Sequence, residues 1–165
     1  MVRADPLAGD EQLGNALIAE IDAHRWPEGG LSSSQLLEIR KLKARVEAER
    51  LPRGADPAKH TKLGPGGIAD VEFLVDYWVL AHSRDYPELV EFPDNIRQLE
   101  GLARVGLVPE ELCLRLKEAY LALRQRVHEL ALDEGGRVVP EAELAPVRDF
   151  VSGVWRDVFA DVEGE

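Results

Sequence analysis

One segment, residues 68–82, constrains the fold more than any other part of the sequence. It reads Ile-Ala-Asp-Val-Glu-Phe-Leu-Val-Asp-Tyr-Trp-Val-Leu-Ala-His. As a helix, it is apolar on most of its circumference, which is typical of a helix that is enclosed by other elements. We therefore place this segment at the middle of a helical bundle.

The rest of the chain has helical periodicity and almost no strand signal. No alternating run of β-branched residues is closed by an Asn-Gly or Asp-Gly turn. The pattern predicts an all-α fold, a compact helical bundle of about five to seven helices that takes in residues 1–165 as a single domain. Besides the central helix, the expected helices are one from Leu13 to a stop at Trp26-Pro27, one capped by Ser32, Ser33 or Ser34 and ending near Arg50, one from Asp94 to Gly106, one from Pro109 to about Leu132 closed by Gly135-Gly136, and one from near Pro146 to Phe159.

The overall charge argues against nucleic acid and anionic membranes as partners. The formal net charge is −11, and both of these partners need a basic surface. No apolar run approaches the ~18 residues that a membrane-spanning helix needs. Cys113 is the only cysteine and no secretory signal precedes it, so we expect a cytoplasmic protein.

Positive charge is nevertheless concentrated in one stretch. Residues 40–62 hold eight of the 20 Lys and Arg residues. If the chain holds an anion, we expect the anion to lie there.

A glycine-rich turn, residues 62–67, lies directly before the central helix. A helix start presents unpaired N–H groups and a partial positive charge, and glycines allow an anion to approach the backbone. A phosphate could sit at Gly66 and Gly67 with Lys62 as its counter-charge; the plain alternative is that the glycines only allow a tight turn. Neither a Walker loop nor a dinucleotide fingerprint fits, because Lys62 precedes the glycines and no strand is expected before them.

Two acidic residues follow this turn, Asp70 and Glu72. On a helix they point about 200° apart, so they cannot share a metal ion as a strand-borne pair can. For Asp70 in the first turn, the plain interpretation is a capping or ion-pair role. Glu72 stands one turn before Asp76, and this spacing calls for a nearby cation. The candidates for that basic support are Arg40, Lys43 and Arg45.

A second cluster, Arg124, Arg126 and His128, lies on the long helix expected after Pro109. An Arg and a His one turn apart form an RNA-cleaving pair in some helical nucleases, but a solvated helix face is the more ordinary interpretation. No spacing suits a zinc site, and we expect no metal site.

Four strings in order along the chain carry a resemblance to a known family. They are Arg40-Lys41-Leu42-Lys43-Ala44-Arg45-Val46-Glu47, then Lys62 with Gly66-Gly67-Ile68-Ala69-Asp70-Val71-Glu72-Phe73, then Asp94-Asn95-Ile96-Arg97-Gln98-Leu99-Glu100, and Ala119-Tyr120-Leu121-Ala122-Leu123-Arg124. Together they resemble the C-terminal helical part of the bifunctional glutamine synthetase adenylyltransferase and deadenylylase. The second string is the most specific, and it is also similar to the helical domain of the PII uridylyltransferases.

The resemblance implies a part of a larger enzyme. That family transfers AMP from ATP to a tyrosine of glutamine synthetase and removes it by phosphorolysis, with magnesium held by an Asp-x-Asp pair in polymerase-like nucleotidyltransferase domains. No such strand-borne pair occurs here, so we expect the catalytic domain to be absent, no catalytic residue to be present, and the fragment alone to be inactive. ATP and magnesium are implied for the parent enzyme, with none bound to the fragment. The implied partners are glutamine synthetase, the PII signalling protein and the parent's own nucleotidyltransferase domain.

The resemblance also assigns roles to residues. Lys62, Gly66, Gly67, Asp70 and Glu72 would line a nucleotide cleft, with Lys62 and the glycines near phosphate and the acids orienting basic neighbours. The domain would then help to close this cleft over ATP. Two alternatives stay open: a non-catalytic module that docks glutamine synthetase or PII protein or senses glutamine, and a ribonuclease-like bundle built on Arg124 and His128.

Overall fold

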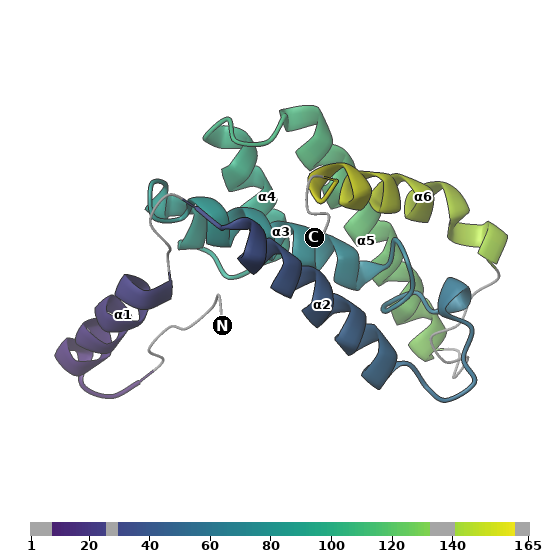
Figure 1. The fold of residues 1–165 in the computed structure, drawn as a ribbon, viewed down its shortest axis with the longest axis horizontal. Helices are drawn as coiled ribbons and strands as arrows, with labels where there is room; N and C mark the ends of the chain where they lie inside the picture. The colour runs from purple at the N-terminus through teal and green to yellow at the C-terminus, as the bar shows by residue number, and fades with distance from the viewer. Residues whose placement is uncertain (1–7, 26–29, 133–140, 161–165) are drawn as a thin grey trace.

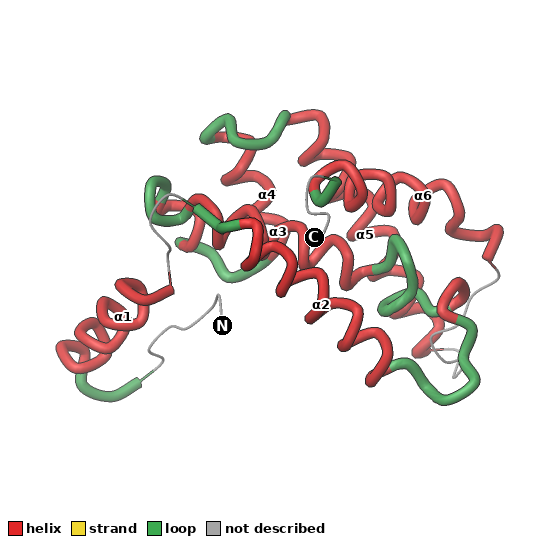
Figure 2. Tube along the Cα trace, in the orientation of Figure 1, coloured by secondary structure: helices red, strands yellow, loops and turns green. Residues whose placement is uncertain are grey.

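The described part of the computed structural model, residues 8–25, 30–132 and 141–160, is helical and contains no strand (Figure 2). Its α-helices are α1 (Glu11–Arg25), α2 (Ser33–Arg50), α3 (Ile68–His82), α4 (Asn95–Arg104), α5 (Glu110–Leu132) and α6 (Glu141–Val158), with short 3-10 helices η1 (Pro57–Lys59) and η2 (Pro87–Val90). The predicted all-α bundle of about five to seven helices is confirmed. The predicted stops at Trp26-Pro27 and Gly135-Gly136 lie outside the described residues.

Helix α3 is the centre of the bundle, as its sequence predicts. It packs against α4, α5 and α6 (Figure 1), and Val71, Leu74, Val75 and Val79 are completely buried. Burial on most sides explains why the helix needs so few polar residues. Its first turn is therefore held in a fixed position relative to three other helices.

Side-chain caps fix two helix starts where the sequence predicts them. The Ser32 hydroxyl accepts from the N–H of Gln35 at 3.3 Å, and the Gln35 side chain accepts from the N–H of Ser32, which completes a capping box. The Asp94 carboxylate accepts from the N–H of Arg97 at 3.0 Å. Both caps satisfy donors that a helix start otherwise leaves unpaired.

Helix α6 begins earlier than predicted. The sequence predicts a start near Pro146, but the helix begins at Glu141 and contains Pro146 within it. A proline inside a helix costs one backbone hydrogen bond. Tertiary contacts hold the extra turn, because Leu144 is buried in the core and Glu143 pairs with Arg126 of α5.

Helix α1 stands apart from the other helices in Figure 1. Its Leu13 and Leu17 side chains are 70% and 58% exposed. Helix α2, in contrast, lies on the bundle, with Leu36, Leu37 and Ile39 packed against the core. Within the described residues, no helix combines the length and apolar character that crossing a membrane requires.

Candidate functional site

The glycine-rich turn before α3 uses its own backbone donors. The N–H of Gly67 donates to the Gly64 carbonyl at 2.9 Å, and the N–H groups of Ile68 and Ala69 donate to the carbonyls of Thr61 and Lys62 at 3.2 and 3.0 Å. These are the groups that a helix start could have offered to an anion. Backbone binding of phosphate at Gly66 and Gly67 stays a prediction, and this hydrogen bonding does not favour it.

Close packing explains why Gly66 and Gly67 are glycines. Gly66 has a φ of +68°, and a Cβ there would overlap the backbone carbonyl of Arg148. A Cβ at Gly67 would lie 2.7 Å from the carbonyl oxygens of Gly64 and Thr61. Both positions therefore exclude a side chain, which supports the plain interpretation that the glycines form a tight turn.

The turn is held from the far end of the chain by Arg148 of α6. The Arg148 side chain is 6% exposed and donates from Nε to the Pro65 carbonyl at 2.9 Å and from Nη2 to the Pro57 carbonyl at 3.3 Å. Arg148 is not among the residues predicted from the sequence. The available signal is an arginine next to Val147 in the apolar pattern of the last helix.

Asp70 belongs to the same structural network. Its Oδ2 accepts from the N–H of Gly66 at 2.9 Å, and its Oδ1 lies 3.0 Å from Nζ of Lys43, which also pairs with Glu47 at 2.7 Å. Burial lowers the pKa of Lys43, but Asp70 and Glu47 outweigh this effect and raise it above its ordinary value. Of the two roles predicted for Asp70, capping or ion pairing, the ion pair is confirmed, whereas Gly67 at the N-cap of α3 has no side-chain cap.

Glu72 points to a different side of α3 from Asp70 and lies close to Tyr120 of α5. The Tyr120 hydroxyl donates to Oε1 of Glu72 at 3.4 Å, and Nδ2 of Asn95 donates to the Tyr120 oxygen at 3.1 Å. Lys43 of α2 pairs with Asp70, which points about 200° away from Glu72 on α3. Arg40 and Arg45 lie exposed on α2.

Beside Glu72 lies a cavity of about 470 Å³, which we call the α3/α5 pocket. The turn and the start of α3 form one side of it, and the second half of α5 forms the other. Its lining residues are Lys62, Ile68, Glu72, Tyr120, Arg124, Val127, His128 and Ala131. The structure thus brings Lys62 and Glu72 together with two members of the cluster on the long helix. The third member, Arg126, pairs with Glu129 and Glu143.

The polar groups of the α3/α5 pocket are suited to binding an anion. Lys62, Arg124 and His128 are basic side chains, and Glu72 is the one carboxylate in the lining. This excess contrasts with the net charge of −11 on the chain. Residues 8–25, 30–132 and 141–160 contain no cluster of three or more His, Cys, Asp or Glu side chains placed to hold a metal ion.

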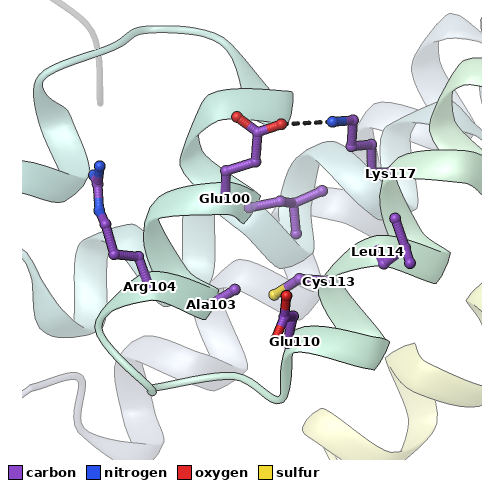
Figure 3. Close-up of a pocket in the computed structure, with 8 residues that line it drawn as sticks. Glu100, Ala103, Arg104, Glu110, Cys113, Leu114 and Lys117 are labelled. Atoms are coloured by element: carbon purple, nitrogen blue, oxygen red, sulfur yellow. Dashed lines mark hydrogen bonds and ion pairs between the residues drawn. The ribbon is translucent and has the colours of Figure 1, made fainter.

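A second cavity of about 590 Å³ lies between α4 and α5 and differs in character (Figure 3). Glu100 and Lys117 pair with each other across it, and the Arg104 side chain points away from the other labelled residues. Burial raises the pKa of the Cys113 thiol to about 11, so the thiol stays protonated near neutral pH. This arrangement offers no activated nucleophile.

Comparison with known proteins places these features in a family. The profile of the GlnD PII-uridylyltransferase family matches residues 40–137, a range that includes Lys62, Glu72, Arg124 and His128. The chain belongs to this family. Members of the family with similar sequences include a bifunctional glutamine synthetase adenylyltransferase/adenylyl-removing enzyme from Thioalkalivibrio sulfidiphilus, which is 41% identical over 164 residues.

Two further relatives carry the same name. The protein from Streptomyces coelicolor is 48% identical over 128 residues, and the protein from Mycobacterium leprae is 42% identical over 135 residues. These matches cover 98%, 76% and 82% of this chain for the Thioalkalivibrio, Streptomyces and Mycobacterium proteins. The chain spans 16% of the length of the first relative and 13% of the other two. The resemblance to both the adenylyltransferases and the uridylyltransferases is confirmed.

Proposed function

We propose that this chain is the helical domain of an enzyme that transfers AMP from ATP to a tyrosine of glutamine synthetase and reverses the transfer by phosphorolysis, and that it helps to close the nucleotide cleft. One observation supports this role above the others. Lys62 and Glu72 converge on an open pocket beside a turn that hydrogen bonds and packing hold rigid.

A rigid turn suits a surface that must close repeatedly over a ligand. The α3/α5 pocket is preformed, so ordering its residues on ligand binding costs little. The proposal places catalysis and magnesium in a nucleotidyltransferase domain of the longer protein. ATP, glutamine synthetase and the PII protein are then the molecules that the cytoplasmic parent protein binds.

Hydrogen exchange of the full-length protein with and without ATP tests the cleft-closing role. We expect the amides of residues 62–72 to exchange more slowly with ATP present, because a closed cleft limits opening of this turn. Unchanged exchange across residues 62–72 at saturating ATP would refute the role in cleft closure.

Activity supplies a second test. We expect Lys62→Ala to lower kcat/KM for ATP by about 10- to 100-fold, the range of a hydrogen bond between charged groups. Lys41→Ala is the matched control, since Lys41 is exposed on α2 and pairs only with Glu38 among the described ion pairs. Equal kcat/KM in the two variants would contradict the proposal.

A docking role is the second candidate, and an exposed apolar stripe on α5 favours it. Leu114 and Leu121 are 52% and 45% exposed and lie two turns apart on one helix face. If this domain docks glutamine synthetase instead, adding glutamine synthetase protects amides of α5 and α6, and ATP leaves residues 62–72 unprotected.

A further inference from the structure

We propose that Lys62, Arg124 and His128 form a phosphate-binding site in the α3/α5 pocket, and that its ligand is the phosphate group of a nucleotide or free inorganic phosphate. This inference rests on the proposed function only for the identity of the ligand. The anion would contact side chains on both sides of the pocket and not the backbone of the glycine-rich turn.

The three basic residues converge on one cavity from distant parts of the sequence. Lys62 precedes α3, while Arg124 and His128 lie one turn apart on α5, about sixty positions later in the sequence. On α5 the lining residues Tyr120, Arg124, Val127, His128 and Ala131 follow helical spacing, so they form one continuous stripe. The fold thus directs these residues to a single cavity.

The charge of the α3/α5 pocket differs from that of the rest of the chain. The chain carries 31 acidic residues against 20 Lys and Arg, so an average surface patch is negative. The α3/α5 pocket has the opposite balance, with Lys62 and Arg124 against Glu72 alone. A cavity with low-dielectric walls strengthens such a local field, and the field attracts anions. Arginine and lysine are also the side chains best suited to phosphate oxygens.

Hydrogen bonds and a ring contact already organise the α3/α5 pocket. Asn95 holds the Tyr120 hydroxyl, which holds Glu72, and both Asn95 and Tyr120 are buried. The Arg124 guanidinium lies 5.6 Å from the centre of the Tyr120 ring, within the range of a cation–π contact. Tyr120 therefore orients both a carboxylate and a cation toward the same space.

Binding measurements on the full-length protein test the proposal with two probes, inorganic phosphate and ATP, by isothermal titration calorimetry. We expect Arg124→Gln and Lys62→Gln each to raise the Kd for phosphate about tenfold or more, the effect of losing a charge-assisted hydrogen bond. Arg104→Gln is the matched control, because it removes the same charge at the α4/α5 cavity. The Kd of Arg104→Gln for phosphate should stay within about twofold of the wild-type value, as expected for a screened surface charge.

Glu72→Gln separates electrostatics from damage to the fold. This variant keeps an acceptor for the Tyr120 hydroxyl but removes the negative charge, so phosphate should bind several times more tightly. A variant that merely unfolds the pocket cannot tighten binding. Weaker or unchanged phosphate binding by Glu72→Gln would therefore count against the site.

The two probes distinguish the sources of the phosphate group. If Arg124→Gln and Lys62→Gln weaken ATP alone, the site holds a phosphate of the nucleotide; if they weaken inorganic phosphate alone, it holds the free ion. If neither affinity changes, or if the wild type binds neither probe, the inference is overturned. Protection of residues 62–72 by ATP with unchanged affinities would overturn this inference and leave cleft closure standing. If Arg124→Gln and Lys62→Gln lose phosphate binding while ATP does not protect residues 62–72, the phosphate site stands and cleft closure is refuted.

Discussion

At the scale of single residues, the glycine-rich turn shows how one missing side chain can decide a local structure. Gly66 combines a positive φ with a backbone neighbour from a distant helix, whereas Gly106 combines a φ of +73° with open space. The two positions have similar backbone strain and differ in packing. At Gly106 only the backbone conformation favours glycine, whereas at Gly66 the close approach of another backbone excludes a side chain as well.

We expect Gly66→Ala to lower the free energy of unfolding by about 3 kcal/mol or more, since strain of about 1–2 kcal/mol adds to a clash with a backbone that cannot easily move. Gly106→Ala should cost only the strain, about 1 kcal/mol. Urea unfolding of both variants measures the difference. Equal losses would show that the Arg148 backbone does not constrain this turn.

At the scale of helices, one ion pair joins α2 to the central helix. Helix α2 has no buried residue, yet Lys43 lies 3.0 Å from the buried carboxylate of Asp70 and 4.6 Å from the centre of the Trp155 ring. A buried carboxylate is costly without a counter-charge. The position of α2 on the bundle therefore depends on this lysine as well as on its apolar residues.

Lys43→Met should lower the free energy of unfolding by about 3–5 kcal/mol at neutral pH, because it leaves Asp70 without its cation. Lys41→Met, which removes an exposed ion pair, should cost less than about 1 kcal/mol. Urea unfolding again supplies the measurement. If Lys43→Met also lowers the free energy of unfolding by less than about 1 kcal/mol, the ion pair has no structural role.

The raised pKa of Lys43 predicts that the free energy of unfolding depends on pH in the alkaline range. The pKa of Lys43 is raised in the folded state, so the folded protein holds this proton more tightly than the unfolded chain. The stabilisation is complete below the ordinary pKa of 10.5 and is lost as pH rises through the folded value. The difference in stability between wild type and Lys43→Met should therefore shrink above pH 10.5 in urea unfolding measured at increasing pH. A constant difference would show that charge is not its cause.

At the scale of the whole molecule, α6 fixes the turn that begins α3. Arg148 connects residues more than eighty positions apart by two hydrogen bonds to carbonyl groups. These bonds place the glycine-rich turn, and with it Lys62 and the α3/α5 pocket, relative to the last helix. The geometry of the candidate site thus depends on a residue outside its lining.

Arg148→Lys should lower the free energy of unfolding by about 2 kcal/mol, since an ammonium group cannot donate to both carbonyls as the guanidinium does. Faster hydrogen exchange should accompany the loss in residues 57–67. Arg156→Lys on the exposed side of α6 is the control, with an expected change below about 0.5 kcal/mol. Unchanged exchange in the turn would show that Arg148 does not hold it.

The sequence by itself determined the elements and the family. Periodicity, caps and the enclosed segment 68–82 predict an all-α bundle, because helix period and helix ends are local properties of the chain. Opposite directions for Asp70 and Glu72 also follow from helix geometry alone. The ordered motifs identified the family that the comparison with known proteins confirmed.

Only the tertiary structure decided which side chains meet. Lys43 pairs with Asp70, Arg148 holds the glycine-rich turn, and Lys62 lines the same pocket as Arg124 and His128. Each case brings together segments that are far apart in the sequence. The early start of α6 has the same origin, since Leu144 and Glu143 make contacts outside their own helix. Such contacts depend on how helices pack in three dimensions, and local sequence patterns carry no record of that packing.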